Sequence, residues 1–115
     1  MLSRDLRLQG RGAFEAVFRT KKSIFGTEIG LFFRSNGLSG PRIGFAFKQK
    51  AFPRSATRHF LKRKGSAIME ELASDLPRGL DVVVLFHKPF SRPVKYGELK
   101  GSLVDLIKRL NQAKK

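Results

Sequence analysis

Two stretches of the chain alternate between apolar and other side chains, which is the pattern of a β-strand with one face in a core. They cover residues 27–35 and 42–48, and the connection between them is rich in turn-forming residues. The positions that share one side of each strand are Ile29, Leu31 and Phe33, then Ile43, Phe45 and Phe47. Because only this short connection separates the two strands, we expect them to pair as a hairpin.

Two further strands complete the predicted sheet. Residues 81–86 contain a continuous apolar run, which is typical of a strand buried on both faces. A short additional strand is expected near residues 23–25.

Three stretches carry apolar residues three and four positions apart, the spacing of amphipathic helices. They cover residues 12–20, about 55–74 and 96–112. In the middle helix, Pro53 and Ser55 suit the start, and Gly65 suits a close approach to the sheet. The expected core stripe is Thr57, Leu61, Gly65, Ile68 and Leu72. The opposite polar arc holds Ser55, Arg58, His59, Lys62, Arg63 and Ser66.

The resulting element order is α, β, β, α, β, α with an extra short strand, a single-domain α+β sandwich over residues 1–115. A hydrophobic fraction of 41% and eleven Phe favour a packed core over a disordered basic tail. The first ten residues are polar and basic, so residues 1–10 are expected to form a flexible arm.

The positive charge of the chain indicates which class of partner it binds. The chain has a formal net charge of +15, and no acidic residue occurs between Glu28 and Glu70. That interval holds nine cations: Arg34, Arg42, Lys48, Lys50, Arg54, Arg58, Lys62, Arg63 and Lys64. A basic helix on a small folded domain predicts binding to a polyanion, above all to nucleic acid. No apolar run suits a membrane span or a signal peptide, so we expect no membrane partner and a cytoplasmic protein.

The residue types present argue against catalysis by the protein's own side chains. The absence of Cys excludes disulfides, thiolate zinc sites and Cys nucleophiles. The chain offers two His and nine carboxylates, and none are paired within an apolar motif. Metal-assisted phosphoryl chemistry requires clustered acidic ligands. We therefore expect neither catalytic nor metal-binding residues in this chain.

Four short strings lie at a specific spacing. Residues 42–44 read Arg-Ile-Gly, and residues 58–63 read Arg-His-Phe-Leu-Lys-Arg. They resemble the signature of the protein subunit of bacterial ribonuclease P, in which an Arg-Val/Ile-Gly strand is followed by Lys-Lys, a loop and a helix beginning Arg-Asn-Arg-Ile/Leu-Lys-Arg. The family's Phe-x-x-Val-Phe helix and Asp-apolar strand are matched by Phe14, Val17, Phe18 and residues 81–84.

The signature helix departs from the family pattern at several positions. His59 stands for the Asn of the motif, Phe60 for its second Arg, and Ser66 for an Arg common later in the helix. Of the family's Lys-Lys pair, the first is Gln49 here and the second is Lys50. These departures remove cationic or amide groups, so the RNA contacts of this helix are expected to be fewer or rearranged.

The resemblance implies an architecture and a task. The fold is similar to a ribosomal-protein domain with a left-handed βαβ crossover, against the usual right-handed rule. The chain would be the non-catalytic protein subunit of an endoribonuclease, with ribonuclease P RNA and precursor tRNA as partners and no dedicated protein partner. It would promote the 5′ maturation of tRNA. Mg²⁺ held mainly by the RNA would support phosphodiester hydrolysis.

The resemblance also implies two sets of site residues. The RNA subunit would contact Arg54, Arg58, His59, Lys62 and Arg63 on the basic helix, since Arg and Lys pair with phosphates. The 5′ leader of precursor tRNA would bind in a cleft containing Phe14, Phe18, Phe32 and Lys50. Small residues beside Phe32, namely Gly30, Gly44 and Ala46, are expected to leave room above the sheet in which bases stack on the rings.

Other functions fit the charge and size. One is a structural RNA-binding protein of ribosomal type, which would not stimulate cleavage of precursor tRNA by a catalytic RNA. Another is a basic nucleoid or membrane-surface protein, which would bind duplex DNA or anionic vesicles instead. An independent nuclease is the weakest alternative, because the chain lacks the necessary cluster of carboxylates or histidines.

Overall fold

The computed structural model describes residues 6–38 and 40–114 and contains one four-stranded sheet in the order β1-β2-β4-β3. β2 is antiparallel to both β1 and β4, whereas β3 is parallel to β4. The strands are β1 (Ser23–Phe25), β2 (Ile29–Ser35), β3 (Arg42–Phe47) and β4 (Leu80–Phe86).

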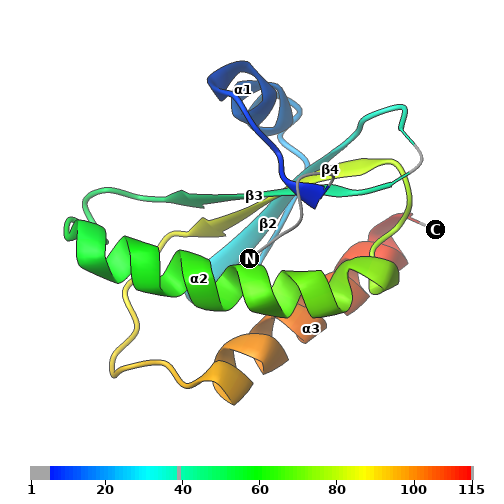
Figure 1. The fold of residues 1–115 in the computed structure, drawn as a ribbon. Coiled ribbons are helices and arrows are strands. Elements are labelled where there is room, and N and C mark those ends of the chain that lie inside the picture. Colours follow the sequence, from blue (N-terminus) through cyan, green and yellow to red (C-terminus); the bar gives the residue numbers. More distant parts are fainter. Residues whose placement is uncertain (1–5, 39, 115) are drawn as a thin grey trace.

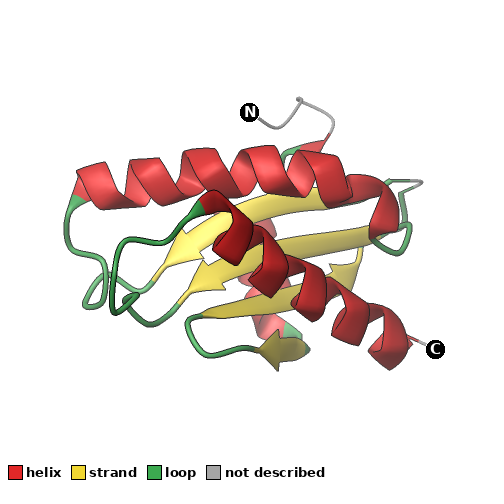
Figure 2. Cartoon of the chain, turned by 90° about the horizontal axis from the view of Figure 1, so that it is seen from below, coloured by secondary structure: helices red, strands yellow, loops and turns green. Residues whose placement is uncertain are grey.

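Helices cover both faces of the sheet (Figures 1 and 2). α2 (Ser55–Leu72), continued by the 3₁₀ turn η2 (Ala73–Asp75), and α3 (Tyr96–Lys114) lie side by side on one face. α1 (Arg11–Arg19) lies on the other face, against β2 and β4. The main core therefore sits beneath α2 and α3, and a smaller one of Leu8, Val17 and Val83 sits beneath α1.

The predicted element order and the α+β sandwich are confirmed, including the short strand at residues 23–25. The predicted hairpin is wrong, because β4 lies between β2 and β3 and pairs with both. β4 is apolar on both faces and nearly every residue in it is buried, so a central position removes more apolar surface from water than an edge would.

β3, α2 and β4 form a βαβ unit with adjacent parallel strands. This connection is the crossover that the resemblance describes, and its left hand stays a prediction. The unit brings the carboxyl ends of β3 and β4 together, since Phe47 pairs with Phe86.

The expectation of a flexible arm over residues 1–10 is wrong for its second half. The Leu8 amide donates a 2.9 Å hydrogen bond to the Ile43 carbonyl, and Arg7 forms a β-bridge with Ile43. Leu8 is only 5% exposed because it packs in the smaller core beneath α1. Residues 1–5 lie outside the described residues.

The helical wheel of α2 is confirmed with two exceptions. Leu61, Gly65, Ile68 and Leu72 are buried, but Thr57 is exposed and Ser66, predicted in the polar arc, is only 7% exposed. A Cβ added at Gly65 would lie 2.7 Å from the Phe45 ring. The glycine therefore lets α2 approach β3 closely, as predicted.

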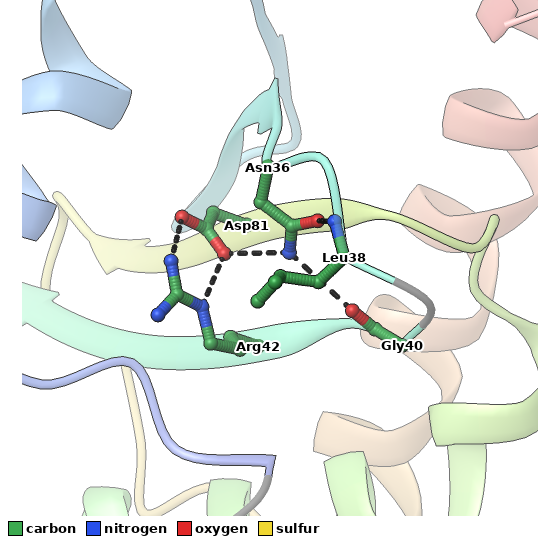
Figure 3. A network of polar contacts seen from close by, with 5 residues as sticks. All are labelled: Asn36, Leu38, Gly40, Arg42 and Asp81. Atoms are coloured by element: carbon green, nitrogen blue, oxygen red, sulfur yellow. Dashed lines mark hydrogen bonds and ion pairs between the residues drawn. The ribbon is translucent and has the colours of Figure 1, made fainter.

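Among the described residues, Asp81 is the one acidic side chain that is buried. It links its own strand β4 to Arg42 of β3 and to Asn36 in the connection between β2 and β3 (Figure 3). Its carboxylate accepts two 2.8 Å hydrogen bonds from the Arg42 guanidinium and one of 2.9 Å from the Asn36 amide. Asn36 also donates to the Gly40 carbonyl and accepts from the Leu38 amide. The network thus ties the connection between β2 and β3 onto β4.

Burial alone would raise the pKa of Asp81. Hydrogen bonds from Arg42 and Asn36, with the charges of Arg42 and Arg34, outweigh burial and hold the pKa below its ordinary value. Arg34 and Arg42 are the register partners of Asp81 on its two neighbouring strands. The carboxylate is therefore ionised between two cations at neutral pH.

We predict that Asp81→Ala lowers the free energy of unfolding by about 1–3 kcal/mol, because Arg42 and Asn36 lose their buried partner. Urea unfolding followed by circular dichroism measures this loss. Asp75→Ala removes an exposed carboxylate and is the matched control. Equal stabilities of the two variants would contradict a role for this network.

The same network predicts a pH dependence. Because the folded-state pKa of Asp81 is lowered, its stabilising contribution is full above the ordinary aspartate pKa of about 4 and is lost as the pH falls through the lowered value. The stability difference between the unsubstituted chain and Asp81→Asn should therefore shrink below about pH 4. Unfolding curves from pH 7 to pH 2 test this, and a difference that stays constant would contradict it.

Candidate RNA-binding surfaces

The cations predicted to bind RNA lie together along the first half of α2. We call this surface the α2 basic face: Arg54, Arg58, His59, Lys62 and Arg63. All are exposed except Arg58, which is half-buried because its Nη1 donates a 2.8 Å hydrogen bond to the Phe52 carbonyl. Among the salt bridges of the described residues, none involves these side chains. Their charge is therefore available to an external anion.

The amino end of α2 adds to this positive surface. The first turn contains no acidic residue, and the N-cap residue Arg54 makes no side-chain capping hydrogen bond. The first backbone N–H groups of a helix have no partner within the helix and carry the positive end of its dipole. A phosphate beside Arg54 would satisfy both.

The other end of α2 is held by the protein itself. Glu71 accepts hydrogen bonds from Lys100, at 2.8 Å, and from the Tyr96 hydroxyl, at 2.9 Å. These bonds lower the pKa of Glu71, the bond from Lys100 contributing most. α2 is thus joined to α3 at its carboxyl half and presents its amino half to solvent.

The three aromatic residues predicted for the leader cleft are brought together on the opposite face of the sheet. Phe14 and Phe18 of α1 and Phe32 of β2 pack around the smaller core and are partly buried. The Phe18 and Phe32 rings meet edge to face with centroids 4.8 Å apart. Phe14 lies over Gly44, two strands away from Phe32.

The expected empty space above the small residues is absent at the two glycines. A Cβ at Gly44 would lie 2.4 Å from the Phe14 ring, and a Cβ at Gly30 would lie 2.5 Å from the Phe25 ring. The glycines therefore make room for the protein's own rings. Leu85 and Ala46, beside Gly30 on the same face, remain partly exposed.

Phe25 and His87 also belong to this site, although the sequence pattern predicted neither of them. Phe25 is 45% exposed. Its ring meets those of Phe32 and His87 edge to face, with ring centroids 5.5 and 5.2 Å away. Phe18, Phe32, Phe25 and His87 thus form a continuous series that we call the aromatic row. Gly30 could have indicated this ring, because Phe25 of β1 pairs with Gly30 of β2 and the glycine leaves room for it.

Lys50 is exposed in the turn after β3, away from α1 and at the end of the sheet where the aromatic row reaches His87. Residues 89–94, shortly beyond His87, line one groove together with Arg54. The aromatic row and the α2 basic face therefore approach the same end of the sheet from opposite faces, with Lys50 in the loop between them.

The described side chains include no group of three or more His, Cys, Asp or Glu that could hold a metal ion. None of the helices in the described part of the chain has the length and apolarity needed to cross a membrane.

Comparisons with known proteins point to one family. The family model described as Ribonuclease P matches residues 2–111. A ribonuclease P protein component from Thermotoga maritima is 32% identical over 111 residues, covering 94% of each chain. One from a Pseudanabaena species is 33% identical over 109 residues, covering 93% of this chain and 92% of the relative.

Solved structures show the same fold. The ribonuclease P protein of Thermotoga maritima superposes with a TM-score of 0.76 at 28% identity, over 90% of this chain and 96% of that one. The Staphylococcus aureus protein gives a TM-score of 0.78 at 16% identity, over 91% and 94%, and supports the fold alone. The chain therefore belongs to the ribonuclease P family, as the protein component of an endoribonuclease that works with an RNA subunit.

Proposed function

We propose that the chain binds the ribonuclease P RNA through the α2 basic face and the 5′ leader of precursor tRNA through the aromatic row. The main support is that these two surfaces approach the same end of the sheet, where β3 and β4 have their carboxyl ends, from opposite faces. An RNA on α2 and a strand on the aromatic row would then lie next to each other, as they must when one RNA cleaves the other.

The α2 basic face suits a folded RNA subunit. Its Arg side chains present forked donors that match phosphate geometry, and Lys62 adds a point charge. The face carries no intramolecular salt bridge among the described residues that RNA would have to break. Binding should therefore be strong at low salt and fall steeply with salt, by a slope of roughly −0.7 to −0.9 per phosphate contact.

The aromatic row suits a single strand of variable sequence. Every base has a π-face, so stacking tolerates any base and contributes about 1–3 kcal/mol per base. Phe25 is the exposed member, Phe32 and Phe18 beside it are partly exposed, and Lys50 is placed for a phosphate. This geometry favours recognition of the leader as a strand and not as a sequence.

The protein contributes binding and orientation to the reaction. Mg²⁺ ions held mainly by the RNA would supply the chemistry, since the described side chains offer no fitting ligand group. The protein would raise the effective concentration of the leader beside the RNA active site. We place this activity in the cytoplasm, where precursor tRNA is made.

The first prediction concerns activity. At low Mg²⁺, multiple-turnover cleavage of a 5′-extended precursor tRNA by a bacterial ribonuclease P RNA should be strongly stimulated by this protein, while the protein alone should cleave nothing. Gel analysis of the released leader measures the rate. Tight RNA binding without stimulation would contradict the proposed function and favour a structural RNA-binding role.

The second prediction concerns the α2 basic face. Arg58→Glu/Lys62→Glu should weaken binding to the RNA subunit and make the salt slope less steep by about 1 to 2, because two phosphate contacts are lost. Filter binding over a range of salt concentrations measures both quantities. Arg78→Glu/Lys108→Glu makes the same charge change elsewhere on the exposed surface and is the matched control. Equal losses in both double variants would show that only net charge matters.

The third prediction concerns the aromatic row. Phe18→Leu keeps apolar cover over the smaller core but removes the ring that supports Phe32. The preference of the holoenzyme for precursor over mature tRNA should fall by about fivefold or more, with RNA-subunit affinity unchanged. Equilibrium binding of the two tRNAs measures this preference. Phe18→Tyr retains the ring and should retain the preference, and a loss in both variants would contradict a stacking role.

A further inference from the structure

A groove lies between the start of α2 and the segment that follows β4. It has a volume of about 720 Å³. Its lining comprises Ala51, Phe52, Pro53, Arg54, Ala56, Thr57, Phe60, Leu61, Pro89, Phe90, Ser91, Arg92, Pro93 and Val94. Neither the α2 basic face nor the aromatic row accounts for this apolar surface.

The floor of the groove is rigid. Phe52, Leu61 and Val94 are buried members of the main core, and Phe52 and Phe90 both contact the Phe86 ring. The walls contain three prolines, whose fixed φ limits backbone movement. The groove is therefore formed before any ligand arrives, and binding would cost little ordering of the protein.

Phe60 is the unusual member of the lining. It is 48% exposed on α2, between the cations of the basic face. The Lys64 ammonium lies 4.6 Å from the centroid of its ring. Leaving a ring of this size in water gains nothing for folding, so its exposure is better explained by a ligand than by stability.

The charge around the groove selects the class of ligand. Arg54 and Arg92 line it, and no acidic residue does. Arg92 makes a 3.2 Å salt bridge to Glu98, but both side chains are exposed, so this pair is weak and exchangeable. An apolar cleft with cations at its rim matches a planar base attached to a phosphate backbone. A peptide without acidic residues would leave these cations unpaired, and a second copy of this basic chain would be repelled by them.

We propose that this groove holds an unpaired nucleobase of the RNA subunit, stacked on Phe60, with the flanking phosphates on Arg54 and Arg92. This proposal rests on the proposed function, because it names a contact within the RNA-subunit interface. The base adds to the phosphate contacts of the α2 basic face a contribution that does not depend on salt. Phe60 thereby selects RNA with a flipped-out base at this position over a uniform duplex.

Fluorescence tests the stacking directly. The chain contains no Trp, so Phe60→Trp introduces a single reporter in the groove, and Leu38→Trp introduces one at another exposed apolar position. Saturating bacterial ribonuclease P RNA should quench the Phe60→Trp emission strongly and leave that of Leu38→Trp nearly unchanged. Unchanged Phe60→Trp emission while RNA is bound would overturn the proposal and leave the groove to a protein partner.

Affinity supplies the second test. Phe60→Ala should weaken RNA binding about 5- to 150-fold at every salt concentration, with the same salt slope as the unsubstituted chain. Phe60→Trp should retain affinity, and Leu38→Ala is the matched control. An affinity equal to that of the unsubstituted chain would overturn the groove proposal alone. Failure of the unsubstituted chain to bind the RNA would overturn the proposed function instead, so the two failures are distinguishable.

Discussion

The position of Asp81 beside two arginines is the constraint on which the rest of the structure depends. The carboxylate lies at the start of the central strand, and its register partners on the two sides are Arg34 and Arg42. A buried carboxylate without those cations would carry a large desolvation cost. Placing β4 between β2 and β3 satisfies this charge, and a hairpin of β2 and β3 would leave it on one side without a partner. The same choice makes the β3-α2-β4 unit parallel.

The parallel unit explains how one small sheet serves two RNA surfaces. It brings the carboxyl ends of β3 and β4 together, so the loop that leads into α2 and the segment after β4 emerge side by side. α2 then lies on one face of the sheet and α1 on the other (Figure 2). The aromatic row lies on the face of α1. The α2 basic face and the aromatic row approach the same end of the sheet, and the exposed Lys50 lies in the loop there.

Much of this arrangement was predictable from local patterns, and the failures share one cause. Periodicity located the three α-helices and the strands β2 and β3, the basic face of α2 and the close approach at Gly65, and a continuous apolar run located β4. Strand pairing was predicted wrongly because alternation says which face a strand buries but not its neighbours. Phe25 was missed, and Gly30 and Gly44 were misread as open space, because the rings that fill that space come from other elements. The groove beside Phe60 likewise joins α2 to a distant loop, and no local pattern describes it.

The rings over the two glycines have a consequence for the dynamics of the molecule. Phe18 belongs to the aromatic row proposed to bind a ligand, and together with Phe14 it also covers the smaller core. That core holds α1 on the sheet with few buried side chains, so α1 is the element that we expect to open locally at the lowest free energy. Anything that binds to the closed form shifts this equilibrium by mass action. Ligand recognition and the docking of the first helix are thus a single linked equilibrium, and amide hydrogen exchange in α1 would report on both.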